Sequence, residues 1–332
     1  MKVLSCVPQQ TYCFADKLRW LDRTAAEFKP DLFVAPQEYV GGVQALFFKT
    51  GEPLHYTEAE VTGPFGKLAK KHKMTLAIGA LIFDATLRQV RERIYLISSN
   101  GKVAGHYDKM MLPAYDINGL TNVYPETDFG KRAQCVEVDG MQLNIMFCWE
   151  VWSNYIWHAL CKSQPDMLLS MIKFGVAGWP QKGKDTETGK DIVAGFGFGD
   201  DGGWTERLRM GSRYDLCAPI VCSTNSWDLP KKAKPLAGVI YPFDDKLHPD
   251  ALWYPPKGDR GNIVEHVQVD EINPLEWRYA RENKFTYKEA VGDWPSSAIR
   301  EHTMMWKVRR MERVHAGLRS GRVKKLPGAE EE

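Results

Sequence analysis

Three reactive side chains stand where apolar stretches of strand character end or turn. Cys148 follows the strand-like stretch 144–147, which is apolar from Ile145 on, Glu38 comes shortly after the stretch 31–35, which is apolar from Leu32 on, and Lys109 is embedded among apolar residues after a hairpin. A thiolate needs a base to receive its proton, and a carbonyl or nitrile under attack needs positive charge where its oxygen or nitrogen becomes anionic. Glutamate supplies the first and lysine the second, so the three types together indicate nucleophilic attack by a cysteine.

Cys148 taken alone has two interpretations. A free cysteine is among the most buried residue types, so a structural role in the core is the simpler one. The chain, however, turns from a strand into an apolar, helix-compatible segment at this residue. Unpaired N–H groups and the positive end of a helix dipole at such a junction favour the thiolate. The partners Glu38 and Lys109 favour the reactive interpretation.

The elements that must position these residues alternate between strands and helices. Asn100-Gly101 and Asp139-Gly140 are strong hairpin signals. The order of strand, helix, strand and then hairpins predicts two sheets sandwiched between helices. Hydrophobic periodicity predicts strands at 2–7, 31–35, 75–82, 93–98, 136–138, 141–147, 166–172, 218–224, 239–241, 251–254 and 263–269, and helices at 16–28, 58–72, 151–160 and 204–216.

Composition indicates an ordinary globular protein with reduced thiols. The chain has 332 residues, 44% of them hydrophobic, and its 44 Lys and Arg nearly balance 42 Asp and Glu, so no global field indicates nucleic acid as a partner. Seven cysteines without a Cys-x-x-Cys pair argue against a disulfide framework or a thiolate zinc site. No apolar run approaches the roughly 18 residues of a membrane span, and the first residues lack the pattern of a signal peptide. We therefore expect a cytoplasmic protein that does not enter membranes.

Two segments differ from the rest of the chain. Residues 173–203 are rich in Gly, Lys, Asp and Thr and are too long for a plain connection, so they read as an insertion or lid. Residues 271–332 read as a basic helical extension with an acidic, disordered end. We expect this extension to pack on a neighbouring subunit; binding of nucleic acid or an acidic partner is the alternative. The main domain is then 1–270.

The flanking motifs make the grouping specific. An apolar strand leads to Pro-x-Glu at 36–38, a hairpin leads to Tyr-x-Lys-x-x-Leu-Pro at 107–113, and another apolar strand leads to Cys-Trp-Glu at 148–150. In that order, over roughly residues 1–270, they resemble the nitrilase superfamily of carbon–nitrogen hydrolases. The resemblance implies a four-layer α-β-β-α sandwich in which two central sheets are flanked by helices.

The resemblance also implies roles for particular residues. Glu38 is similar to the family's general base, Lys109 to its oxyanion-stabilising lysine, Cys148 to its nucleophile, and Glu126 to the second glutamate that supports the lysine. Asp128 and Glu137 are nearby alternatives to Glu126. One departure is that Gln37 stands between Pro36 and Glu38, whereas the family usually has the glutamate directly after the proline.

Substrate contacts are expected from residues around the cysteine and in the loops, and we expect neither a metal ion nor a cofactor. The eight histidines show no metal-ligand spacing. The Gly-x-Gly-x-x-Gly pattern at 197–202 follows no convincing strand and carries two aspartates that would repel a pyrophosphate. The candidate substrate-binding residues are Trp149, Tyr115, Trp152 and Asn225.

The resulting hypothesis is a cysteine-dependent hydrolase of a small-molecule amide. Amide hydrolysis would release a carboxylic acid and ammonia through a thioester acyl-enzyme; a nitrilase is the closest alternative, to which the Cys-Trp-Glu sequence is similar. A carbamoyl substrate is also open, although residues 151–159 lack the arginine common in that branch. A non-catalytic scaffold with a basic tail is the alternative of a different class. The superfamily implies a homo-oligomer built from dimers.

Overall fold

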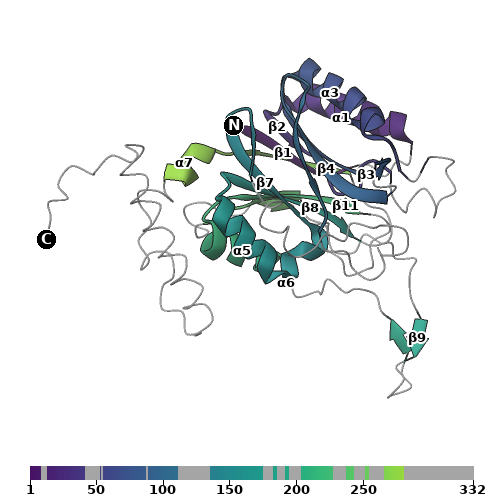
Figure 1. Cartoon of the computed structure of the whole chain (residues 1–332). Helices are drawn as coiled ribbons and strands as arrows, with labels where there is room; N and C mark the ends of the chain where they lie inside the picture. The colour runs from purple at the N-terminus through teal and green to yellow at the C-terminus, as the bar shows by residue number, and fades with distance from the viewer. Residues whose placement is uncertain are drawn as a thin grey trace, which may run out of the picture.

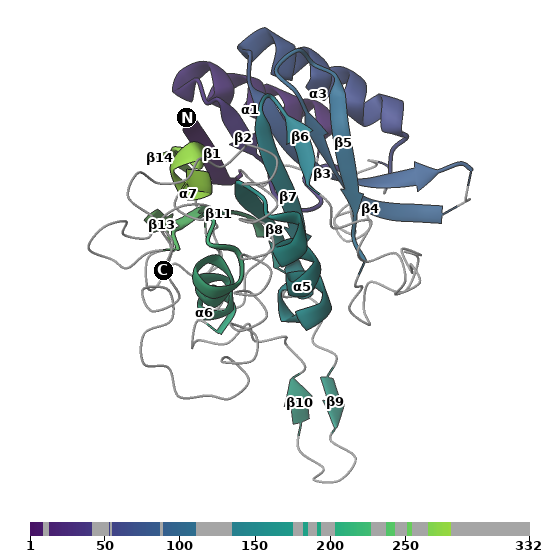
Figure 2. The ribbon, with the colours of Figure 1, turned by 60° about the vertical axis from the view of Figure 1, so that its left-hand side comes forward.

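Two six-stranded sheets and the helices that cover them make up the part of the chain described by the computed structural model (Figure 1). The two outer helical layers lie on opposite sides of the paired sheets, which is the α-β-β-α sandwich that the sequence predicts (Figures 1 and 2). The structure describes residues 1–8, 13–41, 53, 55–86, 89–110, 135–174, 182–184, 191–193, 203–226, 237–242, 251–253 and 265–279.

The first sheet is built around parallel strands that are buried on both faces. The strands β1, β2 and β3 run parallel, whereas β4, β5 and β14 pair antiparallel with their neighbours. Continuous apolar runs such as Leu32–Val34 are typical of such strands. In sheet order the strands are β14 (His266–Glu271), β1 (Lys2–Val7), β2 (Leu32–Val34), β3 (Thr75–Asp84), β4 (Gln89–Ile97) and β5 (Val103–Asp108).

The second sheet repeats this plan. Its strands β7, β8 and β11 are parallel, and antiparallel strands extend it on both sides. In sheet order the strands are β13 (Ala251–Trp253), β12 (Ala237–Ile240), β11 (Ile220–Ser226), β8 (Met167–Phe174), β7 (Met141–Phe147) and β6 (Val136–Val138). Within the segment expected to be an insertion, β9 (Lys182–Lys184) and β10 (Asp191–Val193) form a separate antiparallel pair (Figure 2).

Helices pack on the outer face of each sheet. The helices α1 (Phe14–Phe28) and α3 (Glu58–His72) cover the first sheet, and α5 (Asn154–Ser163) and α6 (Gly203–Met210) lie beside the second (Figure 1). A capping box between Thr57 and Glu60 begins α3, as its sequence favours. The remaining helical segments are a 3₁₀-helix at Cys148–Trp152, a π-helix at Gly211–Leu216 and α7 (Pro274–Tyr279). Within the described ranges no helix has the length and apolar character needed to cross a membrane.

A buried hydroxyl ties the two sheets together. Ser223 on β11 donates a hydrogen bond of 2.6 Å from Oγ to the carbonyl oxygen of Val34 on β2, and the N–H of Cys6 on β1 donates to the same Oγ at 3.0 Å. Buried polar groups must be paired, so these contacts satisfy all three groups at the contact between sheets. They help to fix how the sheets, and therefore the loops at their edges, lie relative to each other.

Most expected elements are present, and two differences bear on the site. The chain does not enter an α-helix directly after Cys148, because the 3₁₀-helix intervenes and α5 begins only at Asn154. The argument that an α-helix dipole favours the thiolate therefore loses force. None of the seven cysteines, all of which lie within the described residues, is part of a disulfide. The division into residues 1–270 and an extension at 271–332 stays a prediction.

Asp270 provides a test of the packing of β14 on β1. Its residue is 8% exposed, and burial raises the pKa of its carboxyl from 3.8 to about 6. Because the folded pKa lies above the unfolded one, the folded state binds the proton more tightly and stability falls as the pH rises from about 4 to about 6. We expect Asp270→Asn to raise the free energy of unfolding at pH 7 by about 1 to 2 kcal/mol and to have less effect at pH 4.

Urea unfolding at the two pH values measures this effect. The exposed neighbour Glu271 is the matched control, because Glu271→Gln should leave the pH dependence of the wild type in place. A destabilised Asp270→Asn protein at pH 7 would contradict the expectation.

Candidate functional site

Cys148 lies where β7 of the second sheet ends. Its residue is 2% exposed and belongs to the core between the sheets. The preceding apolar strand Met141–Phe147 carries it there, and the 3₁₀-helix that follows turns the chain away from the sheet. The cysteine is thus held in an enclosed position at a strand end.

Lys109 lies directly after β5 of the first sheet and is 1% exposed. Its ammonium nitrogen is 5.9 Å from the ring centroid of Phe147, the residue immediately before Cys148. The Tyr107 ring stacks on the same phenylalanine, with 5.7 Å between centroids. Lys109 is therefore no surface lysine with its ammonium in solvent. Its side chain approaches the strand that carries the cysteine.

The Glu150 carboxylate joins these two segments. It accepts hydrogen bonds from the backbone N–H of Met110 at 2.7 Å and from that of Phe147 at 2.9 Å, and from the hydroxyl of Tyr107 at 3.2 Å. The two backbone donors adjoin Lys109 and Cys148 in the chain. One fully buried side chain therefore fixes the lysine segment of one sheet against the cysteine segment of the other.

Glu38 lies in the loop after β2 and is fully buried. Its backbone has φ of +48°, the left-handed region that a residue with a Cβ adopts only at a cost, commonly at functional sites. The loop presses on Gly79 of β3, where an added Cβ would lie 2.7 Å from the carbonyl oxygen of Pro36. A hydrogen bond of 3.0 Å from the N–H of Val40 to the carbonyl of Gly79 holds the loop down.

A polar chain connects the Glu38 loop to Lys109. The amide of Gln37 donates through Nε2 to Oε1 of Glu92 on β4, and Oε2 of Glu92 lies 2.9 Å from Nζ of Lys109. Gln37, Glu92 and Lys109 are all at most 1% exposed. The structure thus brings the surroundings of Glu38, Lys109 and Cys148 into one buried region.

Glu92 was missed when the sequence was considered alone, although a signal for it exists. On β4, Ile94 and Leu96 contribute to the core between the sheets, and Glu92 has the same parity in the strand. A single acid on an otherwise apolar strand face needs a partner. Because the partner, Lys109, lies at the end of the next strand, no local sequence pattern identifies it.

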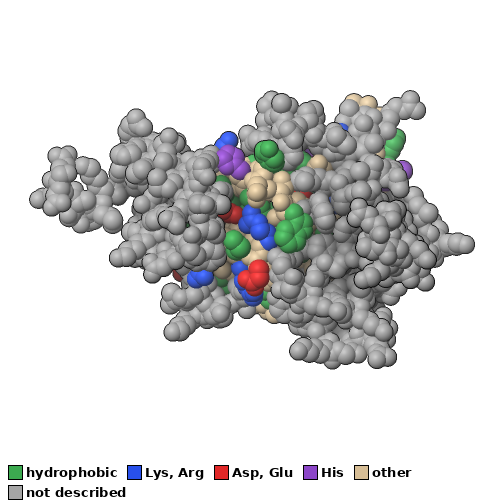
Figure 3. Space-filling model, turned by 90° about the horizontal axis from the view of Figure 1, so that it is seen from below, with side chains coloured by type: hydrophobic (Ala, Val, Ile, Leu, Met, Phe, Trp, Pro, Cys, Tyr) green, Lys and Arg blue, Asp and Glu red, His purple; other side chains and the backbone are tan. Residues whose placement is uncertain are grey.

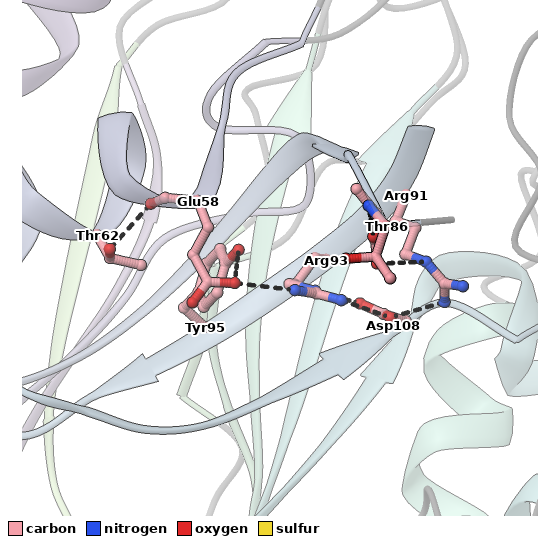
Figure 4. A network of polar contacts seen from close by, with 8 residues as sticks. Glu58, Thr62, Thr86, Arg91, Arg93, Tyr95 and Asp108 are labelled. Carbon is pink, nitrogen blue, oxygen red and sulfur yellow. Dashed lines mark hydrogen bonds and ion pairs between the residues drawn. The ribbon is translucent and has the colours of Figure 1, made fainter. Parts of the chain in front are cut away.

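The face of β4 opposite to Glu92 carries another group of ion pairs (Figure 4). The Asp108 carboxylate accepts a hydrogen bond of 3.0 Å from Arg91 and two, of 2.5 and 2.9 Å, from Arg93. Arg93 also forms an ion pair with Glu58 at 3.2 Å. Burial by itself would lower the pKa of Arg93, but the hydrogen bonds and the charge of Asp108 raise it above its ordinary value. Arg93 therefore stays charged, and both arginines pair with Asp108.

The remaining candidates lie elsewhere or outside the described residues. Tyr115 and Glu126 fall outside the described residues, and most of the loops expected to shape a substrate pocket do too. Trp149 and Asn225 are described only in their backbone, the former in the 3₁₀-helix and the latter in β11. Trp152 is 46% exposed, so it lies at the surface while Cys148 is enclosed.

The arrangement offers a thiol, an ammonium group and carboxylates in an enclosed space, which is suited to attack on a polarised carbon. The described ranges contain no group of three or more His, Cys, Asp and Glu that could hold a metal ion. On the face seen from below, the described side chains mix Lys and Arg with acidic and hydrophobic ones (Figure 3).

Glu150 permits a direct test of the contact between the sheets. Glu150→Gln replaces one acceptor oxygen by an NH₂ group that would face N–H donors, so we expect a loss of about 2 to 4 kcal/mol in the free energy of unfolding. Tyr107→Phe, which removes only the hydroxyl donor, should lose about 1 kcal/mol. Urea unfolding compares the two, and equal stability of Glu150→Gln and the wild type would show that the carboxylate does not hold the sheets together.

Comparison with known proteins agrees with the fold. Among the solved structures that share the fold is a carbon-nitrogen hydrolase from Helicobacter pylori, with a TM-score of 0.57 and 15% identity over 84% of this chain and 92% of that one. Nit3 of Saccharomyces cerevisiae, described as a member of branch 10 of the nitrilase superfamily, has a TM-score of 0.59 and 12% identity over 86% of this chain and 95% of that one. A mutant amidase from Nesterenkonia sp. AN1, which carries acrylamide on its active-site cysteine, has a TM-score of 0.54 and 13% identity over 82% of this chain and 93% of that one. No curated protein sequence matches the chain.

The sequence itself provides the family assignment. The carbon-nitrogen hydrolase family matches residues 14–185, which is more than half of the 332 residues and includes Glu38, Lys109 and Cys148. The chain belongs to the carbon-nitrogen hydrolase family.

Proposed function

We propose that the protein hydrolyses a small-molecule amide to a carboxylic acid and ammonia, with Cys148 as the nucleophile. The observation that carries the proposal is the Glu150 carboxylate, which bonds Met110 and Phe147 and so sets Lys109 beside the strand end that bears Cys148. A thiol and a buried ammonium contributed by different sheets have no packing purpose in common. Their juxtaposition suits a site where a nucleophile and an oxyanion partner must meet.

The proposed reaction proceeds through a thioester. Glu38 takes the proton of Cys148, and the thiolate attacks the amide carbon. Lys109 and the backbone N–H of Trp149 stabilise the negative charge on the oxygen. The C–N bond breaks as Glu38 returns the proton to the nitrogen, and ammonia leaves. Glu38 then removes a proton from water, the resulting hydroxide attacks the thioester, and the acid departs as Cys148 regains its proton.

Glu38 is suited to the proton transfers by its position. Its loop is pinned to β3 at Gly79, and the neighbouring Gln37 reaches Glu92, the partner of Lys109, so the segment that carries Glu38 is tied to the lysine. General acid–base groups must be held within hydrogen-bond reach of the proton that they move. A strained backbone at Glu38 is consistent with a residue held in place for chemistry.

An amide substrate receives support from one structural neighbour. The Nesterenkonia amidase carries adducts of acrylamide and of fluoroacetamide on its active-site cysteine. A nitrile is the second candidate, because Cys148-Trp149-Glu150 is similar to the Cys-Trp-Glu of nitrilases. Nitrile hydrolysis would use the same thiol and lysine, but attack would give a thioimidate; one water would add to it before ammonia leaves, and a second would hydrolyse the resulting thioester. A homo-oligomer with residues 271–332 packed on a neighbouring subunit belongs to the same proposal.

An ammonia-release screen over primary amides, nitriles and N-carbamoyl compounds tests the nucleophile. Cys148→Ala should reduce turnover to the background rate, because the proposed thioester forms on the thiol that this change removes. Cys161→Ala, a half-buried cysteine on α5, is the matched control and should retain full turnover. Wild-type ammonia release by Cys148→Ala would exclude the proposed chemistry, whereas a non-catalytic scaffold would release none in any variant.

Lys109 is tested on the substrate that the screen identifies. Lys109→Ala should lower kcat by about 10² to 10³, the loss typical of a removed oxyanion donor. Far-ultraviolet circular dichroism must first show that the variant keeps its fold. A folded Lys109→Ala protein with undiminished kcat would remove the lysine from the mechanism.

A further inference from the structure

The carboxylate paired with Lys109 comes from an unexpected place. Glu92 lies in the middle of β4, its residue is fully buried, and the strand positions that follow on the same face, Ile94 and Leu96, are apolar core residues. A charged group between two sheets is unfavourable unless it is paired and hydrogen-bonded. Its presence there therefore requires an explanation from its contacts.

Glu92 contacts Lys109 through both its backbone and its side chain. The N–H of Lys109 donates to the carbonyl oxygen of Glu92 at 2.9 Å, and the two side chains form an ion pair at 2.9 Å. The second carboxylate oxygen accepts from Gln37. One carboxylate oxygen of Glu92 therefore faces the lysine ammonium and the other faces the Gln37 amide.

The charges of β4 are divided between its two faces. Arg91 and Arg93 point to the outer face and pair with Asp108, as Figure 4 shows. Glu92 lies between them in sequence but on the inner face, and its ion pair is with Lys109. The lysine–glutamate pair thus lies on the other face of β4 from the arginines and Asp108.

Gln37 connects this unit to the loop of Glu38. Its amide lies one residue before Glu38 and donates to Glu92 while the loop rests on Gly79. Movement of Glu92 would therefore release the lysine on one side and the glutamate loop on the other. Gln37, which separates Pro36 from Glu38, thus has a buried partner for its side-chain amide.

We propose that Glu92 is a positioning residue of the hydrolase, which holds the Lys109 ammonium in place and, through Gln37, sets the loop that carries Glu38. This inference rests on the proposed function of Lys109 and Glu38. An ammonium has three donors, so engagement by Glu92 is compatible with donation to a substrate oxygen. Misplacement of a catalytic group by about 1 Å can lower a rate by about 10².

Exchange of the two side chains provides the test. Glu92→Gln should lower kcat by about 10² while KM changes less than about threefold, because the lysine is misplaced in the transition state more than in substrate binding. Gln37→Glu sets two carboxylates against each other and should also lower kcat. The double variant Gln37→Glu/Glu92→Gln restores one carboxylate and one amide to the same contact, and we expect its kcat to exceed that of Glu92→Gln at least about tenfold.

Matched controls separate positioning from stability. Glu58→Gln makes the same chemical change on the outer face of the sheet, where Glu58 contacts Arg93 and Tyr95. It should leave kcat within about twofold of the wild type. Urea unfolding of every variant identifies those that remain folded under assay conditions.

Each result decides for or against the inference. A folded Glu92→Gln protein with wild-type kcat, or a folded double variant no faster than either single variant, would overturn it. If Glu92→Gln does not fold, the double variant decides: at least a tenth of the wild-type kcat supports the inference and an inactive folded protein opposes it. If that variant also fails to fold, Gln37→Ala decides, with a fivefold or greater loss of kcat expected and no loss opposing the inference.

The assay with Cys148→Ala distinguishes this inference from the proposed function. If Cys148→Ala releases ammonia at the wild-type rate, the proposed function fails and the inference with it. If Cys148→Ala is inactive and Glu92→Gln is not impaired, the proposed function stands and the inference alone is wrong.

Discussion

The contact between the Glu150 carboxylate and the two sheets is the constraint on which the rest of the site depends. The β5 end and the β7 end belong to different sheets, and each contributes a backbone N–H to the same buried carboxylate. Charge-assisted hydrogen bonds in a low-dielectric interior are strong and directional. They set Lys109 relative to Cys148 more tightly than apolar packing between sheets could, because packing alone tolerates small shifts.

In the described residues the core between the sheets is mainly apolar, which gives the polar groups that link its layers particular weight. Ser223 links β11 to β1 and β2, Glu150 links the cysteine strand to the lysine segment, and Glu92 links Lys109 to Gln37. Each of these groups satisfies donors or acceptors from more than one element. The buried polar contacts therefore specify how the layers are registered, while hydrophobic burial supplies most of the stability.

Much of the fold was predictable because local sequence patterns indicate its strands and turns. The hairpin signals Asn100-Gly101 and Asp139-Gly140 and the apolar runs around 32–34 and 141–147 correspond to observed turns and strands. The 3₁₀-helix after Cys148 was not predicted, because it depends on Glu150 turning back to the N–H of Phe147. The contact of Gln37 with Glu92 likewise joins residues 55 positions apart, a distance at which periodicity carries no information.

By itself the sequence determined the types and order of the elements, the two-sheet architecture and the three residues expected to carry the chemistry, since these follow from hydrophobic periodicity and from short motifs at strand ends. The catalytic roles of Glu38, Lys109 and Cys148 stay predictions. Only the tertiary structure decided which carboxylate meets Lys109. Strand pairing places Glu92 opposite the lysine, and a buried ammonium takes the acid that the neighbouring strand presents to it.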